Sequence, residues 1–98
     1  MTLPITFRRP ARNEFDEAYD WYEEQRPGLG EEFSQRVQEV LDRIAALPEL
    51  HQCDFKDIRR GVVRGFPYSV LYRAKADKIV VVAVFHGKRD PAIWQART

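Results

Sequence analysis

Apolar residues recur every three or four positions in the first half of the chain, and this spacing predicts two helices. The steps between successive apolar residues of the first stretch are 4, 3 and 4, which places them on one face of a helix beginning near Pro10: Ala11, Phe15, Ala18 and Tyr22. A second helix is expected from about Glu31 to Ala46, along a continuous apolar stripe: Phe33, Val37, Val40, Leu41, Ile44 and Leu47.

The apolar pattern changes to a period of two beyond residue 57, which is typical of strands. Strands are expected at Ile5–Arg8, Ile58–Arg64, Tyr68–Arg73 and Ile79–Phe85. Since the last of these is apolar at every position, it should be covered on both faces. Residues 49–57 are polar and irregular, and we expect a loop there.

The turn at 26–30 contains one proline and two glycines, so the two helices should form an antiparallel hairpin. The expected order is β-α-α-β-β-β. This order predicts an α+β fold in which the hairpin packs on one face of a mostly antiparallel sheet. With 98 residues, the chain is expected to be one domain spanning 1–98.

Cysteine content and hydropathy indicate a cytoplasmic protein. Cys53 is the single cysteine, so no internal disulfide is possible. The N-terminus shows no charged region leading into an apolar one, as a signal peptide would. The longest apolar run, 79–85, is far too short to cross a membrane.

Charge is divided unevenly along the chain. Residues 11–50 carry eleven acidic and four basic side chains, a net charge of −7, and residues 51–98 carry ten basic and four acidic ones, a net charge of +6. Both halves can simply be solvated, or the second half can attract acidic partners that the first half repels. Carboxylates at Glu14, Asp16 and Glu17 suit the positive end of the first helix.

The basic residues of the second half form the predicted target-binding set: Arg59, Arg60, Arg64, Arg73, Lys88 and Arg89. We expect the four strand arginines to project together from the sheet face opposite the helices, where guanidinium groups bind phosphates and carboxylates. The alternative is that they pair with nearby acids, namely Asp54, Asp57, Asp77 and Asp90, although ten bases outnumber four acids.

The sequence lacks a glycine-rich phosphate loop, a nucleophile elbow and paired metal ligands, so no metal or cofactor is expected. Cys53 has no activating base near it in sequence. His86, at the end of the last strand, is more typical of a structural histidine, but it is the candidate proton carrier if the chain is a nuclease. Residues 91–97 are too few for a stable helix, so they must dock or fray: a buried Trp94 would anchor them against the last strand, whereas an exposed Trp94 would serve a partner.

Ordered motifs along nearly the whole chain resemble toxins of the RelE/ParE superfamily from bacterial type II toxin–antitoxin modules. They are Ala11 with Glu14-Phe15, Ala18 with Trp21-Tyr22, Leu29-Gly30 with Phe33, Leu47-Pro48, Arg59-Arg60 with Val62, Phe66-Pro67-Tyr68 with Val70 and Tyr72-Arg73, Val82 with Val84-Phe85-His86, and Lys88-Arg89-Asp90-Pro91 with Trp94 and Arg97. The resemblance implies the fold derived above, a cognate antitoxin partner and growth arrest.

The target differs between branches of this superfamily. RelE-like members cleave mRNA on the ribosome with an acid/base near the C-terminus, often a tyrosine, whereas ParE-like members inhibit DNA gyrase without nuclease chemistry. This chain has no tyrosine after Tyr72 and a net charge of only +1. We therefore favour the ParE-like, plasmid-stabilisation branch and expect no enzymatic activity. The alternatives are an mRNA interferase, with His86 as the acid/base, and a non-toxic member that only binds its partner.

Overall fold

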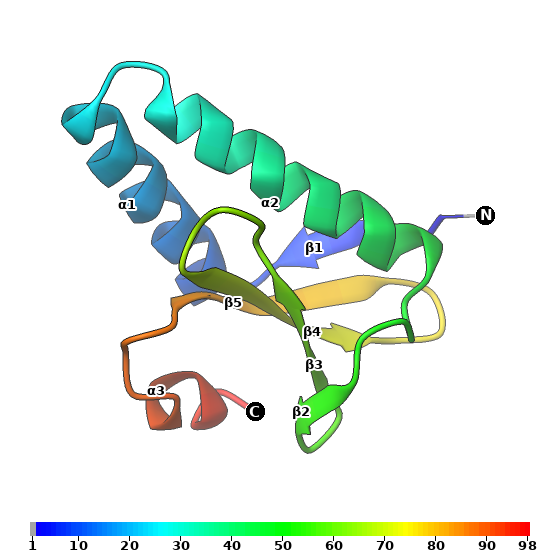
Figure 1. Cartoon of the computed structure of the whole chain (residues 1–98). Coiled ribbons are helices and arrows are strands. Elements are labelled where there is room, and N and C mark those ends of the chain that lie inside the picture. The colour runs from blue at the N-terminus through cyan, green and yellow to red at the C-terminus, as the bar shows by residue number, and fades with distance from the viewer. Residues whose placement is uncertain (1) are drawn as a thin grey trace.

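The computed structural model describes residues 2–98 as a five-stranded sheet with helices on both faces (Figure 1). The helices are α1 (Arg9–Gln25), α2 (Leu29–Ala46) and α3 (Ala92–Gln95). The strands are β1 (Ile5–Phe7), β2 (Cys53–Phe55), β3 (Ile58–Val62), β4 (Tyr68–Ala74) and β5 (Ile79–His86). We call the sheet face covered by α1 and α2 the helix side, and the face that carries α3 the outer face.

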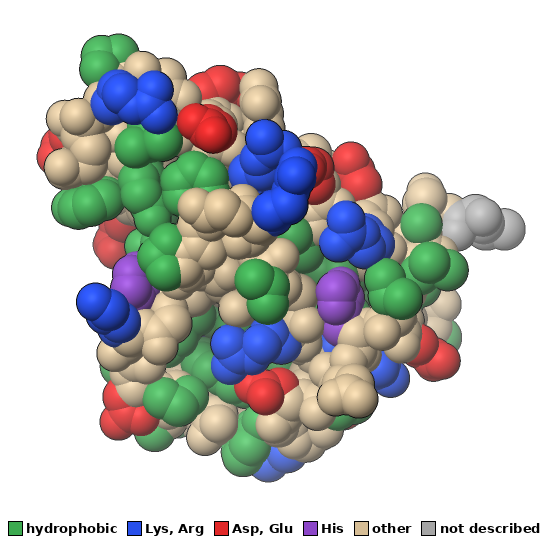
Figure 2. All heavy atoms as spheres, in the orientation of Figure 1, with side chains coloured by type: hydrophobic (Ala, Val, Ile, Leu, Met, Phe, Trp, Pro, Cys, Tyr) green, Lys and Arg blue, Asp and Glu red, His purple; other side chains and the backbone are tan. Residues whose placement is uncertain are grey.

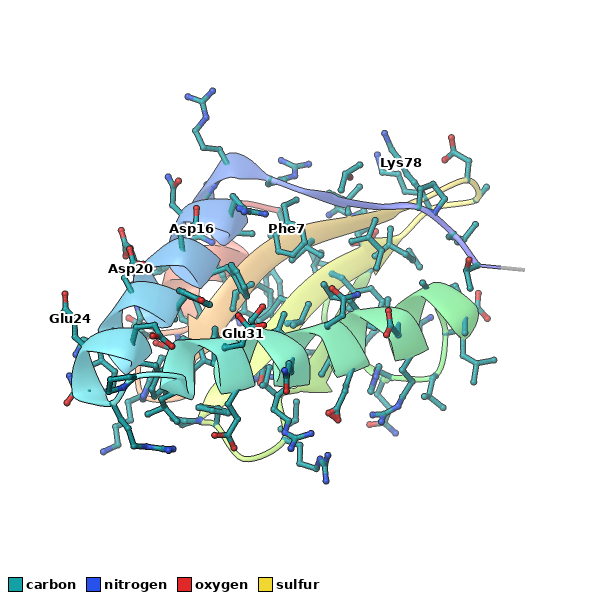
Figure 3. All side chains as sticks on the ribbon, turned by 90° about the horizontal axis from the view of Figure 1, so that it is seen from above. Phe7, Asp16, Asp20, Glu24, Glu31 and Lys78 are labelled. Carbon is teal, nitrogen blue, oxygen red and sulfur yellow. The ribbon has the colours of Figure 1, made fainter. Side chains whose placement is uncertain are left out.

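The two long helices form the predicted hairpin. Pro10 lies in the first turn of α1, where its missing N–H removes no helical hydrogen bond. The chain reverses through Gly28, whose φ of 88° belongs to the left-handed region that glycine adopts without strain. In Figure 3, Asp16, Asp20 and Glu24 point outward along the free side of α1, so the helix presents an acidic stripe to solvent.

Sheet order is β1-β5-β4-β3-β2. Strand β1 runs parallel to β5, with Phe7 opposite Val81 as the last pair, and the other neighbours are antiparallel. Strand β5 therefore lies between β1 and β4 in the interior of the sheet, and its residues from Ile79 to Phe85 are all buried, as predicted. The mostly antiparallel α+β architecture is confirmed.

Two apolar clusters lie on opposite faces of the sheet. The larger one, between the hairpin and the sheet, includes Ala11, Ala18, Phe33, Val37, Val40, Leu41, Ile44, Val70, Tyr72, Val81 and Val84. The smaller one, on the outer face, consists of Ile58, Leu71, Val82, Ala83, Phe85 and Trp94, with Phe55 packed against it. Trp94 is 0% exposed, so of its two alternative roles the anchoring of the C-terminal segment is the one that the structure supports.

The structure departs from the sequence-based expectations at residues 49–57 and decides between the two alternatives left open for residues 91–97. Residues 49–57 were expected to be a loop, but β2 forms within them and pairs with β3. A strand of three residues with an aspartate at its centre has no recognisable period, and pairing with β3 is what specifies it. The segment 91–97, expected to dock or fray, docks: it contains the short helix α3, and the outer face offers this helix an apolar surface.

Candidate functional site

The strand arginines divide between the two faces of the sheet, so the expectation of a single row of four is wrong. Arg59 and Arg60 are consecutive in β3, and consecutive side chains of a strand point to opposite faces. Arg59 lies opposite Tyr72, which belongs to the helix-side cluster, whereas Arg60 lies opposite Leu71 of the outer cluster.

The outer face holds Arg60 and Arg73. A carboxylate oxygen of Asp54 accepts from Arg60 Nη2 at 2.9 Å, and Arg60 Nη1 also donates to the Ser69 hydroxyl at 3.2 Å. Arg73 Nε donates to Asp57 at 2.8 Å, and this hydrogen bond lowers the pKa of the Asp57 carboxyl. Both arginines are thus held in fixed directions by acids of the adjoining loop and strand.

The other two strand-region arginines reach toward α2 and the loop after it. Arg59 Nη1 donates to the backbone carbonyl of His51 at 2.6 Å, and Arg64 Nη2 donates to Glu39 of α2 at 3.0 Å. Hydrogen bonds from Arg36 and then from Arg64 lower the pKa of the Glu39 carboxyl. These contacts are on the helix side, away from Arg60 and Arg73.

Acids from the helical half neutralise bases from the strand half, which the count of charges within the second half did not anticipate. Glu39 pairs with Arg64, and Glu14 pairs with Arg89 and Arg97. On the side of the molecule seen in Figure 2, Lys and Arg side chains are accordingly scattered among other groups, and they form no continuous basic surface there. Within residues 2–98, Lys88 is the member of the predicted target-binding set that forms no ion pair or side-chain hydrogen bond.

His86 lies on the helix side of the sheet, not with the outer-face arginines. Its ring packs edge-on against Tyr68 with 5.1 Å between centroids, and its Nδ1 accepts the backbone N–H of Lys88 at 3.0 Å. Burial raises the pKa of the Tyr68 and Tyr22 phenols, which therefore stay protonated at neutral pH. His86 and the outer-face arginines cannot act on the same reacting group from opposite faces.

Two further side chains of reactive type are the second histidine, His51, and the single cysteine, Cys53. His51 packs edge-on against Tyr72, and burial, followed by the nearby Arg43 and Arg59, lowers the pKa of its imidazole. Cys53 is exposed on β2. Within residues 2–98 no group of three metal-ligating side chains is clustered, and no helix is long and apolar enough to cross a membrane.

A surface groove of about 590 Å³ separates α1 from the ends of β4 and β5. Its lining includes Trp21, Tyr22, Tyr68, His86 and Arg89, together with Glu14 and Glu17 of α1. Trp21 is 55% exposed although its ring packs at 5.1 Å from Tyr22. An exposed tryptophan beside two tyrosines offers a partner protein a rigid apolar anchor point.

Glu14 is the residue that sequence reasoning misplaced. It was interpreted as a favourable charge near the start of α1, but its carboxylate faces β5 and accepts hydrogen bonds from Val84 N–H, Arg89 and Arg97. A signal was available, because Glu14 lies three positions after Ala11 and four before Ala18, which places it at the border of the apolar face of the helix. A carboxylate there must be paired when it is buried.

Comparison with known proteins relates the chain to one group of toxins. Residues 5–91 match the family described as the ParE toxin of the type II toxin-antitoxin system parDE. The chain is 28% identical over 97 residues to Toxin ParE2 of Mycobacterium tuberculosis, in strains CDC 1551 / Oshkosh and ATCC 25618 / H37Rv, covering 98% of this chain and 92% of that protein. A chain of the chromosomal ParDE TA system from P. aeruginosa superposes with a TM-score of 0.74 at 17% identity, covering 87% of this chain and 96% of that one, and so shares the fold.

Proposed function

Because the chain belongs to the ParE toxin family of type II toxin–antitoxin systems, we propose that it arrests growth by binding and inhibiting DNA gyrase. Its toxin role follows from the family, and the target is the proposed part. Arg60 and Arg73 on the outer face, with Lys88 and Arg89 in the turn after β5, supply the basic contacts to the target.

The position of His86 is the observation that favours gyrase over ribosome-bound mRNA as the target. General acid/base catalysis needs the proton carrier within hydrogen-bond reach of the group it serves. His86 lies on the helix side against Tyr68, whereas Arg60 and Arg73 lie on the outer face. On the outer face, Asp54 and Asp57 are already paired with these arginines. His86 has Arg89 beside it in the groove but neither of the outer-face arginines, and this separation favours binding by fixed charges over nuclease chemistry.

A cognate antitoxin is the partner that the family implies. The groove between α1 and the ends of β4 and β5 is the surface on which we place it. Exposed Trp21 and the partly buried Tyr22 and Tyr68 have the composition of an interface centre. Arg89 at the same groove can meet an acidic side chain of the antitoxin.

The decisive experiment compares two activities of the same purified chain. Expressed without antitoxin, both the parent and His86→Gln should arrest growth. The purified proteins should inhibit gyrase supercoiling with the same concentration dependence and should leave ribosome-bound mRNA intact.

The opposite pattern would replace the gyrase target with the ribosome. If His86→Gln loses toxicity and the parent cleaves mRNA only on ribosomes, the chain is an mRNA interferase with His86 as its acid/base. If the parent expressed alone neither arrests growth nor inhibits gyrase, it acts only as a partner-binding member of the family.

A further inference from the structure

Strand β1 covers only part of the edge of β5. Its last pair joins Phe7 to Val81, so the remainder of β5 continues beyond the end of β1. Backbone groups on such an edge need other partners. Two side chains supply them: Glu14 Oε1 accepts the Val84 N–H at 3.1 Å, and Arg97 Nη1 donates to the Val82 carbonyl at 3.2 Å. Side chains thus take the place of a neighbouring strand.

The Glu14 carboxylate also holds both ends of the segment that follows β5. Arg97 forms a bidentate ion pair with this carboxylate: Nη1 donates to Oε1 at 3.0 Å, and Nη2 donates to Oε2 at 2.9 Å. Arg89 Nη1 donates to Oε2 at 3.0 Å. The Glu14 side chain is only 10% exposed, and such charge-assisted contacts are stronger than neutral ones. One carboxylate therefore restrains two arginines eight positions apart.

The segment between these arginines has little stability of its own. Helix α3 has four residues, too few to persist without tertiary contacts. Trp94 docks it in the outer cluster, but its indole Nε1 is buried without an acceptor, which offsets part of the gain from burial. The position of the segment thus depends on Trp94 and on the Glu14 contacts at both of its ends.

We propose that Glu14 is a positioning residue for target binding: it fixes the segment 87–98 and thereby the direction in which Lys88 and Arg89 are presented. The inference rests on the proposed role of these basic residues at the target. Charges on a fixed backbone bind with less loss of conformational freedom than charges on a loose one. If the segment is docked for only a fraction of the time, apparent affinity for the target falls by that fraction.

Glu14→Gln tests this with two independent readouts. The amide keeps the side-chain shape but loses the charge that holds the arginines. Hydrogen exchange of residues 91–98 should become faster, while exchange in the rest of α1 and in α2 stays as in the parent. The concentration for half-inhibition of gyrase should rise about tenfold or more, with full inhibition still reached at saturation. Glu24→Gln, the same change on the exposed side of α1 (Figure 3), should alter neither readout.

Arg97→Gln provides the second variant, because it breaks the same contact from the other side. It removes the Arg97 pair and leaves the Arg89 pair, so it should reproduce both effects in the same direction, and the double variant should be no worse than Glu14→Gln alone, since Glu14→Gln already loses the charge that Arg97 pairs with. Parent-like exchange and inhibition in Glu14→Gln overturn the proposal, and so does faster exchange with unchanged inhibition. If the parent arrests growth without inhibiting gyrase, the gyrase target fails, and the growth arrest caused by the same variants then tests the positioning role.

Discussion

The Glu23 carboxylate of α1 accepts the backbone N–H of Gly30, in the first turn of α2, at 2.8 Å. The same carboxylate accepts the N–H groups of Gly28 and Glu31 at 3.2 Å. The first N–H groups of a helix have no partner within the helix, and a carboxylate is favoured there by the helix dipole. Glu23 therefore caps α2 from the neighbouring helix and closes the hairpin.

Replacing Glu23 by glutamine should lower the stability of the protein at neutral pH. The backbone hydrogen bonds, that from Gly28 first, lower the pKa of the Glu23 carboxyl below its ordinary value of 4.5. Since the folded-state pKa is the lower one, this stabilisation is present above about pH 4.5 and is lost as the pH falls through the folded-state value. Urea unfolding of parent and Glu23→Gln should thus differ at pH 7 and converge toward pH 3. A difference that is constant with pH would show that the charge is not what stabilises the cap.

Gly30→Ala should destabilise the protein although alanine is the better helix former. A Cβ at Gly30 would lie 2.6 Å from the Tyr19 backbone carbonyl oxygen, and backbone cannot move aside cheaply. Overpacking costs about 1–3 kcal/mol, which exceeds the helix-propensity gain of about 1 kcal/mol. Gly87→Ala is the control, because its Cβ would meet only the Pro67 carbonyl at 3.6 Å. Equal unfolding midpoints for the two variants would contradict the close packing of α1 on α2.

The sequence predicts the hairpin and the main strands well because each depends on a local pattern. Phe33 and Ile44 repeat with the helical period, and Val70 and Tyr72 with the strand period, so burial could be inferred position by position. Strand β2 depends on its pairing with β3, and the docked position of α3 depends on the outer apolar cluster. Both are long-range effects that no local window contains.

The candidate site was predicted less well, and only partly for the same reason. Alternation alone was enough to separate Arg59 from Arg60, so the expected single row was an avoidable error. The partners of Arg64 and Arg89 are Glu39 and Glu14, respectively 25 and 75 positions away, and no count of charges within one half of the chain could pair them. Whether these side chains bind a target stays a prediction.

Trp94→Ala should cost about 3–5 kcal/mol of unfolding free energy, as expected for a fully buried aromatic side chain. Trp94→Phe should cost clearly less, because it removes the unpaired indole N–H along with part of the volume. Chemical unfolding measures both. Ile93→Ala, on the exposed side of the same helix, is the control and should be close to neutral. If Trp94→Ala is as mild as Ile93→Ala, α3 does not anchor the outer face.

Trp21→Ala should weaken antitoxin binding while leaving growth arrest intact. Aromatic anchors at interface centres contribute about 2 kcal/mol or more, which corresponds to roughly a 30-fold loss of affinity. Titration of the purified toxin with its cognate antitoxin measures this loss. Leu47→Ala is the matched control, since Leu47 is equally exposed but lies at the far end of α2. Equal affinities of the two variants would place the antitoxin outside the groove.

Arginines on the two faces of the sheet should respond differently to substitution by alanine. The double change Arg60→Ala with Arg73→Ala removes both outer-face guanidiniums and leaves Asp54 and Asp57 without partners, so the local charge there changes sign. We expect growth arrest to weaken and gyrase half-inhibition to require at least about tenfold more protein, roughly 1.4 kcal/mol of binding free energy.

Arg64→Ala breaks only an ion pair on the helix side, where Arg64 is 75% exposed, and such pairs contribute about 0–1 kcal/mol. It should keep both the fold and the toxicity. Unfolding curves must show that all variants are folded, because only then does a loss of gyrase inhibition report on the substituted surface. Should Arg64→Ala abolish arrest while the outer-face pair does not, the target binds the helix side of the sheet, and the outer face has no part in toxicity.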